Sequence, residues 1–264
     1  MKNIIRRELK INLKTFITFL GVCLAFLLMI NLMYPMLKEN MVEFEKLLES
    51  FPDSFLAAFN MDDLGFGSII EFYATEGYLY MNLLIGAYAV ILGSSILLKE
   101  KSDKTSEYLL SKPISRKEIY LSKYLAGVIY VLAMNLIVYL VNVVSSGLID
   151  TLDIVSLSLL SLATFLLTWL FYTIGFFISL FKKKPRKTLG IGLGILFGSY
   201  LVFILSLLSE KIQFLENFSI FYYLDSTPMV KENTFNIVYI IGIISLTLIL
   251  LTIGLKIYEK KDIY

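Results

Sequence analysis

The chain has 264 residues and a formal net charge of +2; 57% of its residues are hydrophobic and only 17% are charged. This balance excludes an ordinary soluble domain and is typical of membrane proteins. The chain has no histidine, which excludes zinc-type and Ser–His chemistry. Its single cysteine, Cys23, can form no intramolecular disulfide. From the apolar composition we expect an all-α integral membrane protein, and from the absence of histidine we expect no metal site.

The first 14 residues are basic and amphipathic. On a helical wheel one face is mostly apolar, with Glu8 and Asn12 as exceptions. The opposite face carries the cations Arg6, Arg7, Lys10 and Lys14. A helix of this kind can lie in the headgroup layer with its cations toward anionic lipid. We therefore predict an interfacial helix here, with an ordinary basic flank of the first span as the alternative.

Six apolar runs follow, each near or above the roughly 20 residues that cross a hydrocarbon core. They cover residues 15–37, 77–98, 124–149, 154–181, 188–208 and 237–255. None contains Asp, Glu, Lys or Arg, which are costly at mid-span. The first run is too long for a signal-peptide core and has no cleavage site, so we interpret it as a retained span. Residues 1–264 then form a single transmembrane domain with an external helical loop over residues 38–76.

The distribution of positive charge predicts the orientation of the spans. Twenty lysines and arginines lie on one side of the six spans and four on the other. By the positive-inside rule, both termini are expected in the cytoplasm. We therefore predict a multi-pass protein of the plasma membrane.

The first external loop has a helical pattern. Apolar residues recur at helical spacing from Leu37 to Phe51, and Pro52 ends the pattern. Phe55, Leu56 and Phe59 predict a second short helix. We expect an external helical cap on the outer ends of the spans.

The last external loop, residues 209–236, is too apolar for a free loop and too interrupted for a span. A helical re-entrant segment that enters the outer leaflet and ends near Pro228 fits this composition best. The fifth span, which precedes this loop, carries a small-residue face that is suited to close helix packing. Its members are Gly190, Gly192, Gly194 and Gly198. We expect this face to pack within one subunit rather than at a dimer contact.

Motifs for an independent energy source or for catalysis are absent from the sequence. It contains no Walker-type phosphate loop and no hydrolase or metalloprotease motif. No carboxylate pair lies within a span, and Glu76, at the outer edge of the second run, is interpreted as interfacial. The polar residues within the spans, expected to bond across helices, are Asn31, Asn82, Asn135 and Asn142. Uphill transport would therefore need a partner that supplies the energy.

Residues 99–123 form the longest polar interruption on the predicted cytoplasmic side. Ser102 can cap a short helix that ends at Pro113, and Ser115 with Glu118 forms a capping box that starts the next helix. Three apolar residues, Tyr108, Leu109 and Leu110, remain on a segment outside the bilayer. They fit either the lipid interface and neighbouring spans or a groove on a partner protein.

This stretch resembles the signature of permeases of the type-2 ABC exporter family. Those proteins often carry, between spans two and three, a Glu, a Gly-Thr pair, Glu-x-Leu-Leu-Ser, a Pro, then Ser-Arg and a Lys. The matching residues here are Glu100, Thr105, Glu107, Leu109, Leu110, Ser111, Pro113, Ser115, Arg116 and Lys123. Lys104 stands where the family usually has glycine. The basic start, six spans and apolar segment before the last span extend the resemblance over the whole chain.

The resemblance implies a permease without enzyme activity, in which two copies, or two related chains, bind two cytoplasmic ABC ATPase subunits. ATP and Mg²⁺ would be held by the partner, and no cofactor by this chain. The residues implied to couple to the ATPase are Glu100, Thr105, Glu107, Tyr108, Leu109, Leu110, Pro113 and Arg116. The other expected contact is membrane lipid, with no nucleic acid.

The cargo implied is lipophilic or amphipathic: a peptide, antibiotic, drug or lipid. Three other classes of function compete with this one. A sensor or immunity protein could use the same scaffold to bind a ligand without moving it. An ion-coupled carrier would need a carboxylate within a span, and a membrane-embedded enzyme would need clustered catalytic residues.

Overall fold

The computed structural model describes residues 1–260 except 49, 53–55, 57–64, 100–114, 183 and 209. The described residues form helices and no strand. Six helical stretches are long and apolar enough to cross a membrane, which confirms the predicted all-α, six-span architecture. They are α1 (Lys2–Glu39), the stretch of α4 (Ile69–Phe72), η1 (Tyr73–Gly77) and α5 (Tyr78–Ile96), then α8 (Arg116–Ile149), α9 (Ile154–Ser179), α10 (Pro185–Leu207) and α12 (Ile237–Lys260).

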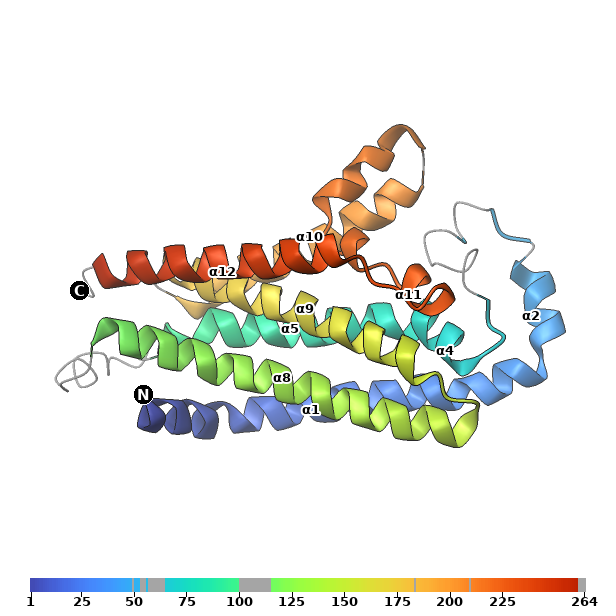
Figure 1. Ribbon diagram of the computed structural model, residues 1–264, viewed down its shortest axis with the longest axis horizontal. Helices are drawn as coiled ribbons and strands as arrows, with labels where there is room; N and C mark the ends of the chain where they lie inside the picture. Colours follow the sequence, from blue (N-terminus) through green and yellow to red (C-terminus); the bar gives the residue numbers. More distant parts are fainter. Residues whose placement is uncertain are drawn as a thin grey trace.

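The long helices lie side by side in a bundle (Figure 1). The start of α1, the end of α5, the start of α8 and the end of α12 lie at one end of the bundle, which we call the basic end. The opposite end, the α2 end, carries α2 (Met41–Leu48), α4 and α11 (Thr227–Lys231). Both termini and the connection between the second and third spans therefore share one end.

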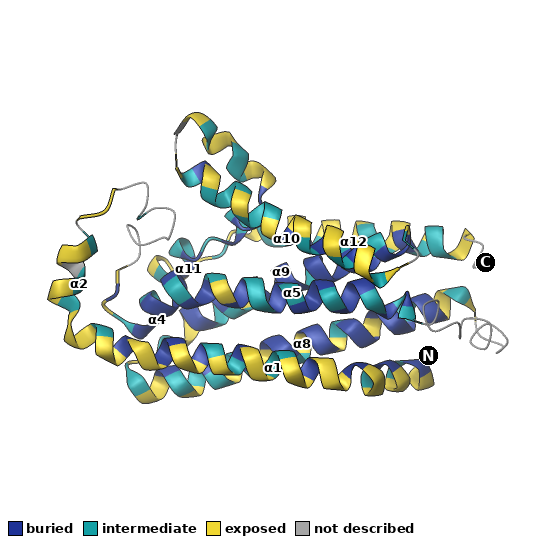
Figure 2. Ribbon diagram, turned by 180° about the vertical axis from the view of Figure 1, so that it is seen from behind, coloured by how far each residue is buried: buried dark blue, intermediate teal, exposed yellow. Residues whose placement is uncertain are grey.

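The centre of the bundle is formed by α5 and α9, which are the most buried of the six spans, whereas α10 and α12 are the least buried (Figure 2). Two glycines bring the backbones of α5 and α9 close together. A Cβ added to Gly93 would lie 2.3 Å from the Tyr172 carbonyl oxygen, and one on Gly175 would lie 3.0 Å from the Val90 carbonyl oxygen. Small residues of this kind allow the close helix contacts that are common in membrane proteins.

Three of the four predicted asparagines join the spans, whereas Asn82 Oδ1 has no hydrogen-bond partner among the described residues. Asn31 of α1 donates to Asn142 Oδ1 of α8 over 3.0 Å and to the Ser145 hydroxyl over 2.7 Å. Asn135 of α8 donates to Thr168 Oγ1 of α9 over 3.0 Å. These bonds satisfy the amide donors of Asn31 and Asn135, which would otherwise face an apolar interior, while Asn31 Oδ1 has no partner among the described residues.

The predicted interfacial helix over residues 1–14 is not a separate element, and its position in the headgroup layer stays a prediction. These residues are the first turns of α1, which runs unbroken into the first span. The sequence has no glycine or proline between residues 1 and 20 to interrupt the helix. The cations Arg6, Arg7, Lys10 and Lys14 are exposed, as expected. The residues that repeat every four positions toward the bundle are Ile4, Glu8, Asn12 and Phe16.

The first external loop begins as predicted, with α2 over the repeating apolar residues. Phe44 of α2 meets Phe66 edge to face at a centroid distance of 5.2 Å, so α2 packs against the segment that leads into α4. The predicted second helix around Phe55–Phe59 lies, apart from Leu56, outside the described residues.

The last external loop is divided into two parts rather than forming one helical dip. Its first part is a 3₁₀ helix, η2 (Glu210–Phe218), which leaves Phe214 and Phe218 exposed. Its second part contains η3 (Tyr222–Leu224) and α11, and packs back into the bundle with Phe221, Leu224 and Met229 buried. Entry of this loop into the outer leaflet stays a prediction.

The predicted small-residue face of α10 is also corrected. Gly190, Gly194 and Gly198 have no neighbouring atom within 4 Å of an added Cβ, so they form an open stripe. Only Gly192 packs inside the subunit, where an added Cβ would lie 2.6 Å from Val90 Cγ1. The reason is helical geometry, because a residue two positions from Gly190 and Gly194 points to the other side of the helix.

Because α5 and α9 are in close contact, adding one methyl group at Gly93 should lower the stability of the protein. Gly93→Ala should lower the free energy of unfolding by about 1–3 kcal/mol because the methyl group meets backbone atoms of α9. Gly242→Ala on α12 is the matched control, since nothing lies within 4 Å of its added Cβ. Thermal unfolding of both variants in detergent would test this, and equal stability would contradict the packing described.

Candidate functional site

Most of the predicted coupling residues fall in residues 100–114, which we call the coupling segment. Glu100, Thr105, Glu107, Tyr108, Leu109, Leu110 and Pro113 all lie outside the described residues. Arg116 is described, as are the residues on either side of the segment, Lys99 and Ser115. The geometry of the site is therefore that of the helices that enter and leave the coupling segment.

The helix that leaves the coupling segment has a well-defined start. The Ser115 hydroxyl accepts the Glu118 backbone N–H over 3.2 Å, and the Glu118 carboxylate accepts the Ser115 backbone N–H over 3.2 Å. This is the predicted capping box. It satisfies two backbone donors at the start of α8 and fixes the position at which the chain becomes helical.

Arg116 lies against the last turn of α12. Its guanidinium donates to the Glu259 carbonyl oxygen over 3.0 Å, a favourable place for a cation because helix carboxyl ends carry partial negative charge. One turn further along α8, the Tyr120 ring packs on Tyr258 at a centroid distance of 5.4 Å. The Tyr120 hydroxyl donates to the Leu251 carbonyl oxygen over 3.2 Å. The first turns of α8 are therefore fastened to the last span.

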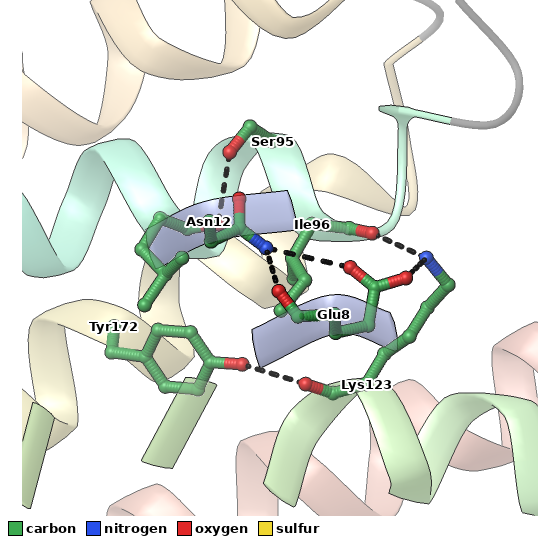
Figure 3. A network of polar contacts seen from close by, with 7 residues as sticks. Glu8, Asn12, Ser95, Ile96, Lys123 and Tyr172 are labelled. Atoms are coloured by element: carbon green, nitrogen blue, oxygen red, sulfur yellow. Dashed lines mark hydrogen bonds and ion pairs between the residues drawn. The ribbon is translucent and has the colours of Figure 1, made fainter. Parts of the chain in front are cut away.

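A buried ion pair joins three spans beside the coupling segment (Figure 3). Lys123 Nζ of α8 lies 2.9 Å from Glu8 Oε1 of α1 and donates to the Ile96 carbonyl oxygen of α5 over 2.7 Å. The two charged side chains are only 2% and 1% exposed. Ile96 is the last residue of α5, and Lys123 lies two turns into α8. One ammonium group therefore connects both flanks of the coupling segment to α1.

Neighbouring polar groups complete this network. The Asn12 amide donates to the Glu8 carbonyl oxygen over 2.9 Å and contacts Glu8 Oε2 at 3.5 Å. The Tyr172 hydroxyl of α9 donates to the carbonyl oxygens of Tyr124 and Lys123, at 3.1 and 3.4 Å. A buried charge is tolerated only when it is paired and hydrogen-bonded, and both conditions hold here.

A second ion pair joins α1 and α8 at the α2 end. Lys38 Nζ lies 3.2 Å from Asp150 Oδ2, and the Tyr34 hydroxyl donates to the same oxygen over 2.9 Å. Hydrogen bonding by the Thr151 backbone N–H is the main cause that holds the pKa of Asp150 below its usual value, with smaller contributions from Tyr34 and Lys38. The two helices are thus fastened at both ends.

The sequence reasoning did not find the partner of Lys123. Glu8 and Asn12 were exceptions on the apolar face of the first 14 residues, and Lys123 was matched only as part of the family signature. Their spacing of four was the available signal, because it places both polar side chains on one face of a helix. In the part of the chain that the structure describes, no three His, Cys, Asp or Glu side chains form a group that could hold a metal.

Comparison with known proteins decides the family. The family described as "ABC-2 family transporter protein" matches residues 1–263. The chain belongs to the ABC-2 transporter family. Among curated proteins, no match was found. As a member of this family with six apolar helices, it is a multi-pass membrane permease subunit, and the resemblance of residues 100–123 is confirmed at the level of the family.

The ion pair predicts an unequal response to two lysine substitutions on one helix. Lys123→Met leaves the Glu8 carboxylate buried without its cation, so the free energy of unfolding should fall by about 3–5 kcal/mol. Lys117→Met, at an exposed position of the same helix, should change it by less than about 0.5 kcal/mol. Thermal unfolding in detergent measures both.

The double variant Glu8→Gln/Lys123→Met separates the ion pair from the packing of the lysine chain. Because it removes both charges, it should regain much of the stability lost in Lys123→Met. Additive losses from the two substitutions would contradict a direct pair.

Proposed function

We propose that this permease subunit exports a lipophilic or amphipathic molecule and that separate cytoplasmic ATPase subunits drive it by binding at the basic end. The observation that carries the proposal is the Lys123 network, because it links the two flanks of the coupling segment to α1. ATP and Mg²⁺ belong to the partner in this scheme. The basic end is cytoplasmic, in agreement with the charge distribution of the loops.

In this scheme the coupling segment seats in a groove of the ATPase through Tyr108, Leu109 and Leu110. A movement of the segment is then passed to α5 and α8, which border it directly. The ammonium of Lys123 passes the same movement to α1, and Arg116 passes it to α12. Interlocked cores respond to such a displacement by moving as units, because close-packed side chains do not deform continuously.

The two ends of the α1–α8 pair support movement as one body. Lys123–Glu8 fastens the helices at the basic end and Lys38–Asp150 at the α2 end. The close backbone contact of Gly93 and Gly175 similarly joins α5 to α9. By contrast, α10 and α12 leave most of their surface uncovered. Relative movement is therefore expected between copies of the subunit more than inside one copy.

We place a second copy of this chain, or a related permease, against the open stripe of α10. Gly190, Gly194 and Gly198 are spaced by four and have nothing within 4 Å of an added Cβ. Small residues at this spacing suit close helix association in a membrane. The cargo path then runs between the copies, along the first, second and fifth spans.

The positions of the acidic residues disfavour an ion-coupled carrier. The helices extend beyond the apolar runs, so the first two candidate spans contain carboxylates. Glu39 is the last residue of α1 and Glu71 accepts the Gly67 backbone N–H, which leaves Glu8 and Glu76 to consider. Glu8 is neutralised by Lys123 at the basic end, whereas Glu76 belongs to η1, which directly follows α4 at the α2 end. The two carboxylates are thus too far apart to share a coupling ion.

The coupling assignment is tested by Leu109→Asp. A carboxylate in an apolar ATPase groove would be desolvated, so association with the ATPase should weaken at least about tenfold. Copurification of an ATPase with the tagged chain, and ATP hydrolysis by the complex, measure the effect. Leu148→Asp at the α2 end, where the leucine is 82% exposed, is the control and should leave both unchanged. Normal complex formation and ATP hydrolysis by Leu109→Asp would overturn the assignment.

A further inference from the structure

A groove near the α2 end is apolar except for one carboxylate. It lies between α1, α2 and the stretch from Phe66 to α5, and has a volume of about 460 Å³. We call it the outer groove and define it by the lining residues Phe26, Met29, Met33, Phe72, Glu76 and Tyr80. Small-molecule sites typically have volumes of about 300–1,000 Å³ and combine apolar walls with a few polar groups.

The carboxylate of the outer groove is carried by an unusual turn. Glu76 belongs to η1, a five-residue π-helix between α4 and α5. π-Helical turns are rare in proteins, and those that do occur are often found at functional sites. Two hydrogen bonds hold this turn. The Ser226 hydroxyl donates to the Ala74 carbonyl oxygen over 3.2 Å, and the Tyr78 hydroxyl donates to the Leu224 carbonyl oxygen over 2.8 Å. The returning loop before α12 therefore fixes η1 in place.

A glycine is required at the end of this turn. An added Cβ at Gly77 would lie 2.4 Å from Cδ2 of the Tyr73 ring and 3.4 Å from Ile30 of α1. The turn is thus closely packed on α1. Its geometry leaves Phe72, Glu76 and Tyr80, spaced by four, along one wall of the outer groove.

Glu76 differs from Glu8, Glu71 and Asp150 because, among the described residues, none bonds to or pairs with its carboxylate. Glu8 meets Lys123, and Asp150 meets Lys38 and Tyr34. Glu71, one turn before Glu76, accepts the Gly67 backbone N–H over 3.0 Å. A carboxylate held among apolar side chains is unfavourable unless a cation or hydrogen-bond donor accompanies it.

The other walls suit an apolar cation. The Phe26 and Tyr80 rings meet edge to face at a centroid distance of 5.6 Å, and aromatic faces attract cations. Met29 and Met33 are each 49% exposed and can adapt to ligands of different shape. The groove therefore combines one negative charge with aromatic and flexible apolar surface.

We propose that the outer groove binds a lipophilic organic cation, with its positive group beside Glu76 and its apolar body against Phe26, Met29 and Met33. The positive group is an ammonium or phosphonium, and its charge takes the place of a partner that the described part of the chain does not supply. Binding is a property of the permease chain alone. It can therefore be tested whether or not the proposed ATPase coupling is correct.

The test is equilibrium binding of radiolabelled tetraphenylphosphonium to the purified chain in phosphatidylglycerol nanodiscs. The wild-type chain should bind it saturably, and Glu76→Gln should weaken binding at least about tenfold. Glu43→Gln, which removes an exposed carboxylate from α2, is the charge-matched control and should bind as the wild type does. Met33→Trp should also weaken binding, because the indole occupies the groove. Thermal unfolding of each variant confirms that it is folded.

A neutral ligand and a second lipid sharpen the result. Triphenylphosphine oxide, which has a similar apolar body and no net charge, should bind equally to the wild type and to Glu76→Gln. Replacing phosphatidylglycerol by phosphatidylethanolamine should leave cation binding saturable; its loss would mean that a lipid amine occupies the groove and would overturn the proposal. Absence of saturable binding, or equal binding by Glu76→Gln, would also overturn it. So would a change in the number of chains per particle on Met33→Trp, because a second copy would then cover the groove.

Discussion

The ion pair between Glu8 and Lys123 is the constraint on which the rest of this permease depends. Neither charge can be buried alone in an apolar bundle, so α1 and α8 must meet at this level and in this register. The third partner, the Ile96 carbonyl oxygen, brings the end of α5 to the same point. Because α5 ends just before residues 100–114 and α8 begins just after them, the same electrostatic requirement joins both flanks of this segment to α1.

The sequence predicted the architecture well where the physical signal was local. Apolar length gave the six spans, and the Ser115–Glu118 spacing gave the start of α8. The sequence did not predict the Glu8–Lys123 pair, because no residue near Glu8 indicates that its partner is a lysine 115 positions away. The glycines of α10 failed for another reason: composition identifies small residues, but only the packing of α10 on α5 decides which of them are covered. The π-helix η1, which carries Glu76, follows from no local sequence pattern identified in this chain.

The two ends of the bundle differ in how their carboxylates are accompanied. At the basic end, the Lys123–Glu8 pair is buried and joins α8 to α1. At the α2 end, Glu76 lines an apolar groove and is held by a turn that the returning loop supports. Among the described residues, the buried carboxylate of Glu8 is thus paired within the chain, whereas the carboxylate of Glu76 has no polar partner.

The central claim is that α1 and α8 move as one body when the partner ATPase binds nucleotide. The direct measurement is the distance between spin labels at positions 10 and 117, both exposed, in a chain whose buried Cys23 has been replaced. In the reconstituted complex, this distance within one copy should change by less than about 2 Å on addition of ATP. The distance between position 117 in the two copies should change by more. An intrachain change as large as the change between copies would contradict the account.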